Sequence, residues 1–347
     1  MTAAASPAGP PEPWQTGEAG EATEATGTGE ATEATGTGEA AEAGEARRTR
    51  QTSQSARLAG PLGGRPLIVC DLDGTLLRPD GTASAYTRDA LNRLAAAGVA
   101  LTIATARGVP SIRALLAGVE LPLPVVELGG AYLSDAVTGE HFVHHTLDRE
   151  VTVALVDALE LAGIEPTLTS WDGTADHVDF GELGNDSVRW FHAEKAAKGD
   201  RRLRYCADFG ALARSTQVVL ARLAAPHDDA ERVGKLIAAV CGDRASVLAI
   251  RNDYCPGWTE FSVAAPTADK GTAVRGLRER LGHTGPLAVC GDHLNDLSMF
   301  AVATGPQDRR IVPSNAHPDV LALATEVTGP SDADGVARHL VSTYLPC

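Results

Sequence analysis

The sequence is poor in aromatic residues and methionine, and it has no long apolar run. Phe, Trp and Tyr make up 4% of its 347 residues, and there are two methionines. No run approaches the roughly 18 apolar residues that a membrane helix needs. The first residues show neither the basic start nor the apolar centre of a secretory signal, and no Lys/Arg cluster has aromatic residues interleaved. We therefore expect no membrane span, no secretion and no nucleic-acid polymer as partner.

The cysteines are few and widely spaced. Six are scattered along the chain without a C-x-x-C pair, and Cys70 and Cys290 each end an apolar run. A disulfide framework or a zinc site needs paired, regularly spaced cysteines, whereas an isolated buried thiol behaves as a small apolar side chain. The pattern predicts free thiols and a cytoplasmic protein.

Negative charge is concentrated near the N-terminus. The formal net charge is −15, and residues 1–46 hold nine Glu but no Asp, Lys or Arg, which leaves −6 for the remainder. Residues 20–28 are repeated identically in residues 29–37. With almost no large apolar side chains, this segment cannot offset its ordering entropy by burial. We expect residues 1–64 to form a disordered acidic tail without a catalytic part.

From residue 65 onward, short apolar runs alternate with helical patterns, which is typical of a parallel α/β sheet covered by helices on both faces. Residues 134–265 interrupt this alternation, and we call this segment the cap. The sequence predicts a doubly wound, Rossmann-like core from residues 65–133 and 266–347, with the cap as an inserted α+β domain. The core strands are predicted at 67–70, 99–105, 124–128, 287–290, 310–312 and 326–328.

Two carboxylates follow the first apolar run. Asp71 and Asp73 lie one residue apart at its end, so their side chains leave the strand on the same side. Gly74 then permits a sharp turn. Such a pair suits a carboxylate nucleophile beside an acid/base, with a hard divalent cation near a phosphate. An ordinary strand that runs into an acidic turn would look the same, so other residues must decide.

Further polar residues stand where other strands are predicted to end, which is where a doubly wound fold binds ligands. Thr105 could donate its hydroxyl to a phosphate, and Lys270 before a helix could offset phosphate charge. The run Asp292-His-Leu-Asn295-Asp296 offers oxygen ligands suited to Mg²⁺. Residues 312–316 form another turn at a strand end. Taken singly, each of these also fits a structural or solvated position.

Together these motifs resemble those of the haloacid dehalogenase-like hydrolases, and more narrowly the Cof-type sugar-phosphatase branch with its late-inserted (C2-type) cap. The resemblance covers about residues 65–345. It implies that Asp71 is the nucleophile and Asp73 the general acid/base. It also implies that Thr105 binds phosphate.

The same resemblance implies roles for the second half of the core. Lys270 would balance charge and bind phosphate, and Asn295 would support phosphate binding. Mg²⁺ would be held by the carboxylates of Asp71 and Asp292 and by the backbone carbonyl of Asp73. Asp296 would support these ligands without binding the ion directly. Three positions depart from the family pattern: Ala106 replaces a usual glycine, Gly129-Gly130 replaces Asn-Gly, and His293 stands where a small residue is common.

Three functions follow from these motifs. The first is a Mg²⁺-dependent phosphatase that hydrolyses a small phosphorylated metabolite (a sugar phosphate, nucleotide or cofactor phosphate) through an aspartyl-phosphate. The second is a phosphomutase of the same superfamily, which would pass phosphate to a sugar. The third is a domain that binds metabolites without catalysis, against which the intact set of motif residues argues. The sequence predicts no oligomeric state.

Substrate choice is expected to lie in the cap. Trp171, Arg251, Asn252 and Tyr254 are candidate substrate contacts, because aromatic and polar side chains recognise rings, hydroxyls and phosphates. The core of the cap could equally claim the aromatic residues. Asp176, His177 and Asp179 fit a solvated loop better than a metal site.

Overall fold

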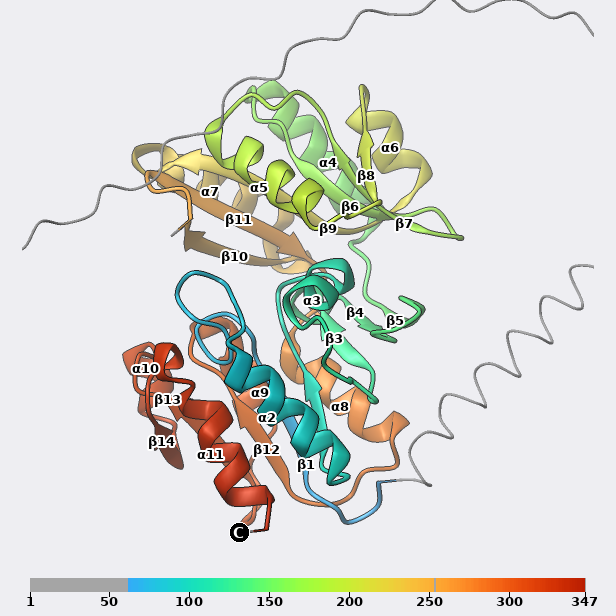
Figure 1. The fold of residues 1–347 in the computed structure, drawn as a ribbon. Helices are drawn as coiled ribbons and strands as arrows, with labels where there is room; N and C mark the ends of the chain where they lie inside the picture. Colours follow the sequence, from blue (N-terminus) through green and yellow to red (C-terminus); the bar gives the residue numbers. More distant parts are fainter. Residues whose placement is uncertain (1–61, 253, 347) are drawn as a thin grey trace, which may run out of the picture. The chain divides into compact units, whose positions relative to one another are not determined.

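The computed structural model describes residues 62–252 and 254–346. The predicted acidic tail lies outside the described residues, apart from positions 62–64. The described strands form three sheets, and helices accompany them (Figure 1). No helix in the described ranges is long and apolar enough to cross a membrane.

The core sheet has five parallel strands in the order β14-β13-β12-β1-β2. The central strand β1 pairs with β2 on one side and with β12, from the far end of the chain, on the other. Leu67 stands opposite both Ala100 and Leu287. The strands are β1 (Leu67–Cys70), β2 (Ala100–Ile103), β12 (Leu287–Cys290), β13 (Arg309–Pro313) and β14 (Glu326–Thr328).

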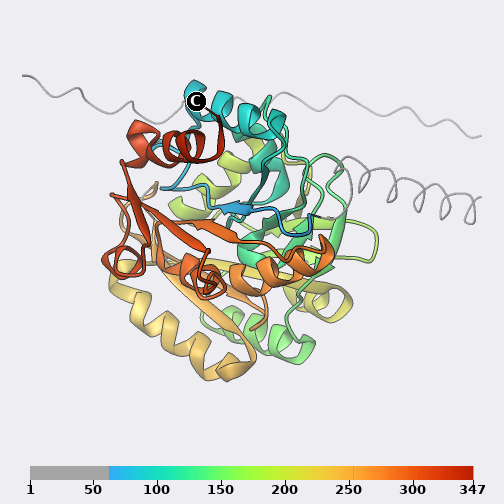
Figure 2. The same cartoon turned by 90° about the horizontal axis from the view of Figure 1, so that it is seen from below.

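Side chains of β1 alternate between two apolar clusters. Ile68 and Cys70 pack with α2 (Ala85–Ala96) and α11 (Gly335–Tyr344), which lie side by side in both views (Figures 1 and 2). Leu67 and Val69 pack with α8 (Lys270–Arg280) and α9 (Leu297–Phe300). Burial of both faces explains why β1 is apolar throughout. The predicted doubly wound α/β fold is confirmed.

A small antiparallel sheet continues from the core. It is joined to the end of β2 by a parallel bridge between Ala104 and Val126. Ala104 N still bonds to Cys70 O at 2.8 Å, but Thr105 N turns to Val126 O at 2.9 Å, so β2 is shorter than the predicted 99–105. The sheet consists of β3 (Val125–Glu127), β4 (Tyr132–Ser134) and β5 (His141–His144), and the remaining core helices are α3 (Val109–Leu115) and α10 (Pro318–Leu321).

The cap contains a six-stranded sheet in the order β10-β11-β9-β6-β7-β8. One apolar cluster, drawn entirely from residues 147–263, packs α4, α6 and α7 on it. Its strands are β6 (Thr167–Trp171), β7 (Asp176–Phe180), β8 (Leu203–Tyr205), β9 (Gln217–Pro226), β10 (Ser246–Arg251) and β11 (Trp258–Ala264). Its helices are α4 (Arg149–Leu161), α5 (Asp186–Ala197), α6 (Phe209–Ser215) and α7 (Ala230–Cys241). The domain limits at 134 and 265 stay a prediction.

Candidate active site

The centre of the site is a buried ion-pair bridge. Asp71 directly follows β1, and its backbone N–H continues the sheet by donating to Cys290 O at 2.9 Å. Lys270 is 1% exposed and donates to Asp71 Oδ1 at 2.6 Å and to Asp296 Oδ1 at 2.7 Å. It stands at the first position of α8, where Asp269 caps the helix by accepting from Thr272 N. Lys270 thereby links the ends of β1 and β12.

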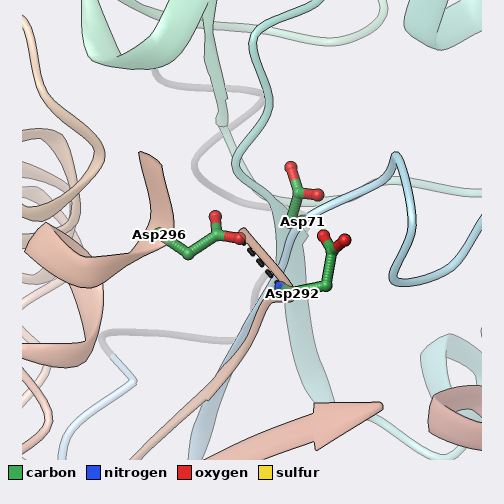
Figure 3. Close-up of side chains that lie close together, drawn as sticks. All are labelled: Asp71, Asp292 and Asp296. Atoms are coloured by element: carbon green, nitrogen blue, oxygen red, sulfur yellow. Dashed lines mark hydrogen bonds between the residues drawn. The ribbon is translucent and has the colours of Figure 1, made fainter. Parts of the chain in front are cut away.

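Three carboxylates gather around this bridge. Asp71, Asp292 and Asp296 each offer an oxygen, and these oxygens lie within 4.8 Å of one another (Figure 3). Asp296 Oδ2 accepts hydrogen bonds from the backbone N–H groups of Asp292 at 2.9 Å and His293 at 3.0 Å, which closes the turn after β12. Asp296 is therefore both a structural anchor of the loop and a member of the cluster.

The cluster has an excess of negative charge. Burial raises the pKa of Asp71 well above its ordinary value; Lys270 opposes this rise, while Asp296 and Asp292 add to it. Burial and Asp296 raise the pKa of Asp292 to about 7. Burial disfavours the charged form of Lys270, but Asp296 and Asp71 together raise its pKa above the ordinary lysine value. Three carboxylates thus share one bridging ammonium, a donor set that suits a hard divalent cation.

The turn after β1 is built to reach Asp292. Gly74 has φ +73°, and a Cβ there would lie 2.1 Å from Asp292 Oδ2, so only glycine fits. Thr75 donates its hydroxyl to Asp292 Oδ1 at 3.1 Å. Asn315, in the strand-end turn at residues 312–316, donates to Gly74 O at 2.9 Å. The sequence singled out that turn but not the part Asn315 plays in fixing the Asp71 loop.

Asp73 lies outside the three-carboxylate cluster but close enough to raise the pKa of Asp71. Arg107 binds the Asp73 carboxylate in a bidentate ion pair. Its Nε donates to Oδ2 at 2.8 Å, and its Nη2 donates to Oδ1 at 2.7 Å. Arg107 also donates to Glu194 of the cap at 3.0 Å. The arginine therefore connects the predicted acid/base with the cap, a role that sequence reasoning missed.

The phosphate-binding candidates Thr105 and Asn295 lie just beyond the ends of β2 and β12. Thr105 is fully buried, and its hydroxyl accepts from Arg107 N at 3.2 Å. Ala106 is not among the non-glycine residues with positive φ, so the departure from glycine is accommodated. Asn295 is half-buried in the short turn between Asp292 and Asp296. The phosphate-binding roles of Thr105 and Asn295 stay predictions.

Of the four cap candidates, the structure brings Tyr254 to the site. Its hydroxyl lies 3.5 Å from Asp73 Oδ1, and Trp190 stacks on its ring at 5.1 Å between centroids. Asn252 is buried and donates to Glu260 at 2.7 Å, which is a structural contact within the cap. Trp171 packs edge-on against His141 and His144, and Arg251 is exposed at the end of β10.

The acidic and histidine residues of the cap that we expected to be solvated are instead paired. Asp176 binds Arg202 at 2.6 Å, Asp179 binds Arg204 at 2.6 Å, and His177 lies 2.8 Å from Asp172. Among the described residues, Asp71, Asp292 and Asp296 are the one cluster of side chains that could hold a metal ion.

Comparisons with known proteins give relatives along most of the chain. A 5-amino-6-(5-phospho-D-ribitylamino)uracil phosphatase (YwtE) of Bacillus subtilis is 28% identical over 297 residues, which cover 79% of this chain and 96% of the relative. An HMP-PP phosphatase of Cronobacter sakazakii is 28% identical over 280 residues, covering 78% of this chain and 92% of that protein.

Solved structures support the same fold. A haloacid dehalogenase-like hydrolase from B. subtilis superposes with a TM-score of 0.64 at 20% identity, covering 80% of this chain and 99% of that one. The model of one family, described as haloacid dehalogenase-like hydrolase, matches residues 68–340. The chain therefore belongs to the haloacid dehalogenase-like hydrolases, in their Cof-type branch, and is a phosphoric monoester hydrolase.

Proposed function

We propose that this protein is a Mg²⁺-dependent phosphatase that acts on a small phosphorylated metabolite through an aspartyl-phosphate on Asp71. The observation that carries the proposal is the bridge from Lys270 to Asp71 and Asp296, at 2.6 and 2.7 Å, at the carboxyl ends of β1 and β12. Both relatives are named as phosphatases of small molecules, which supports a small phosphorylated metabolite as the substrate of this protein. A cytoplasmic location, which the free thiols of the described cysteines suit, is part of the proposal.

The residues present fit Mg²⁺. Oxygen atoms of Asp71, Asp292 and Asp296 lie within 4.8 Å of one another. Burial, together with the negative charge of Asp296, raises the pKa of Asp292, and Lys270 offsets this rise only in part. We propose that Asp71 and Asp292 hold the ion directly, with the Asp73 carbonyl and the substrate phosphate, and that Asp296 supports them. When bound, the ion would supply positive charge to the transferring phosphoryl group.

The reaction follows from the placement of the two aspartates. A carboxylate oxygen of Asp71 attacks phosphorus in line, and the bond from phosphorus to the leaving oxygen breaks. Asp73 donates a proton to that oxygen. It then takes a proton from a water molecule that attacks the aspartyl-phosphate, which releases phosphate and restores Asp71. Lys270 and Thr105 stabilise charge on the phosphoryl oxygens.

A phosphomutase would share these residues and differ in the acceptor. It would return an isomeric phosphate and little free phosphate, so product analysis separates the two reactions. The relatives, which are named phosphatases, favour transfer to water. We therefore retain hydrolysis as the proposed reaction.

Phosphate release from a panel of sugar phosphates, nucleotides and cofactor phosphates tests the proposal, with Mg²⁺ or with EDTA. Asp71→Asn should abolish release, and the exposed Asp89→Asn on α2 is the matched control that should not. Near-full activity of Asp71→Asn, or release that is indifferent to EDTA, would overturn the mechanism. Silence across the panel together with isomerised product would replace the phosphatase by the mutase.

A further inference from the structure

Two cations of the cap, Lys195 (buried) and Arg222 (half-buried), lack a close carboxylate of their own. Lys195 on α5 has a side chain that is 8% exposed, and Arg222 on β9 has one that is 23% exposed. Both approach the ring of Phe191, at 5.1 and 5.2 Å from its centroid. This ring is the apolar support that the two cations share.

The nearest carboxylates are occupied by other partners. Lys195 Nζ and Asp200 Oδ2 are 4.0 Å apart, whereas Arg202 holds Asp200 with two hydrogen bonds of 2.8 Å. Arg222 Nη1 and Glu260 Oε2 are also 4.0 Å apart. The other Glu260 oxygen accepts from Asn252, as described above. Neither cation is therefore neutralised by a short ion pair of its own.

The hydrogen bonds that remain are to neutral groups in residues 106–111, the segment that follows β2. Arg222 donates to Ala106 O at 3.2 Å, and Lys195 lies 3.4 Å from Ser111 Oγ. Ala106 directly precedes Arg107, whose guanidinium holds Asp73, so Arg222 contacts the segment that positions the proposed acid/base. Glu194, which binds Arg107, is the neighbour of Lys195 in the chain.

The electrostatic balance agrees with this geometry. Burial, then Arg222 and Arg202, lower the pKa of Lys195 to about 8 although Asp200 and Glu194 oppose them. Burial also lowers the pKa of Arg222; Glu260 opposes this shift and Arg107 adds to it. Buried cations are costly unless an anion compensates them. The cap therefore presents positive charge that an incoming oxyanion would stabilise.

We propose that Lys195 and Arg222 form a subsite for a second oxyanion on the leaving group, so that the preferred substrate carries a phosphate or carboxylate besides the phosphate that is cleaved. The proposal rests on the proposed phosphatase function and names its substrate class. A guanidinium fits the paired oxygens of either group, and the lysine adds a point charge.

A matched set of six-carbon substrates tests the subsite. Glucose 6-phosphate has a neutral leaving group, 6-phosphogluconate adds a carboxylate, and glucose 1,6-bisphosphate adds a phosphate. We expect a higher kcat/KM for one or both doubly anionic substrates than for glucose 6-phosphate. Which of them is preferred distinguishes a carboxylate subsite from a phosphate subsite.

Substitutions then assign the preference to residues. Lys195→Met and Arg222→Met should each lower the ratio of kcat/KM between the preferred substrate and glucose 6-phosphate by about 10- to 100-fold, mainly through KM. Lys195→Arg should restore part of the ratio. Lys235→Met, which removes an exposed lysine of α7, is the control that leaves the ratio unchanged. An unchanged ratio in both subsite variants would overturn the subsite while leaving the phosphatase intact.

Proton uptake gives a readout that does not depend on turnover. The charged groups facing Lys195 are Arg222, Arg202, Asp200 and Glu194. An added oxyanion would raise the Lys195 pKa, so calorimetry at pH 8 in two buffers should show uptake of about half a proton on binding of glucose 1,6-bisphosphate to Asp71→Asn. The double variant with Lys195→Met should show none. Equal uptake in both variants refutes the subsite, and absence of turnover in the wild type refutes the phosphatase.

Discussion

Replacing His141 with Gln removes a buried charge that joins the core to the cap. The His141 side chain is 4% exposed and lies between Glu127 Oε1, at 3.3 Å from Nδ1, and Asp176 Oδ1, at 3.5 Å from Nε2. Glu127 ends β3 and Asp176 begins β7, so the imidazolium links two sheets. Tyr132 stacks on the ring at 3.9 Å between centroids. Burial opposes the charged imidazole, yet the two carboxylates raise its pKa from 6.5 to about 9.

The size and sign of the effect follow from proton linkage. Below pH 6.5 the histidine is charged in both the folded and the unfolded chain, and its full contribution to stability is present. Between pH 6.5 and 9 only the folded state keeps the proton, so stability falls by about 1.36 kcal/mol per pH unit. A shift of this size corresponds to about 3 kcal/mol. The 3.5 Å contact between Nε2 and Asp176 is too long for a strong hydrogen bond. We therefore expect the charged His141 to contribute about 2 kcal/mol to the free energy of unfolding.

Urea unfolding of the wild type and His141→Gln at pH 6, 7.5 and 9.5 measures this contribution. The difference between their free energies of unfolding should shrink by about 2 kcal/mol as the pH rises through 9. His144→Gln is the contrasting control, because burial lowers the pKa of His144 and the trend should therefore have the opposite sign. A difference that is constant across this pH range refutes the charged bridge.

Four further substitutions concern the core. Lys270→Met leaves Asp71 buried without its cation, so we expect loss of at least 100-fold in kcat and of about 3 kcal/mol in the free energy of unfolding by urea in EDTA. Gly74→Ala should weaken Mg²⁺-dependent activity, because the new Cβ would clash with Asp292. Gly276→Ala on α8 meets no atom within 4 Å, so it should raise the free energy of unfolding by about 0.5–1 kcal/mol in the same denaturation assay. Ser84→Ala removes the hydroxyl that caps α2 and should lower the thermal stability by about 1 kcal/mol.

The core site was predictable because its residues follow apolar strands directly. The carboxyl ends of neighbouring parallel strands meet at one edge, so the order of β1 and β12 alone brings Asp71 and Asp292 together. Local rules also placed the core strands to within two residues at each end. The strand predicted at 99–105 was too long, because the backbone N–H of Thr105 bonds to Val126 O instead of continuing β2. This pairing depends on the position of β3, which local sequence does not encode.

The cap side of the site was much less predictable. Arg107 and Glu194 are 87 residues apart, and their contact depends on how α5 is placed, which no local pattern encodes. Asn252 has the right chemistry for a substrate contact, yet it is buried against Glu260 and Ser187. A polar side chain that binds a ligand and one that satisfies a buried neighbour look alike in sequence. The contacts of the cap residues that lie near Asp73 therefore needed the structure.

The position of β12 in the core sheet has a consequence for biosynthesis. Leu67 of β1 pairs with Leu287, so the central strand keeps one open edge until the ribosome has made some 220 further residues. At typical elongation rates this takes roughly 10–40 s. The hydrogen-bonded partners in the six-stranded sheet all lie between Thr167 and Ala264, so that sheet can close first. The nascent chain thus carries an exposed apolar β1 edge for tens of seconds, the interval in which chaperones would be most needed.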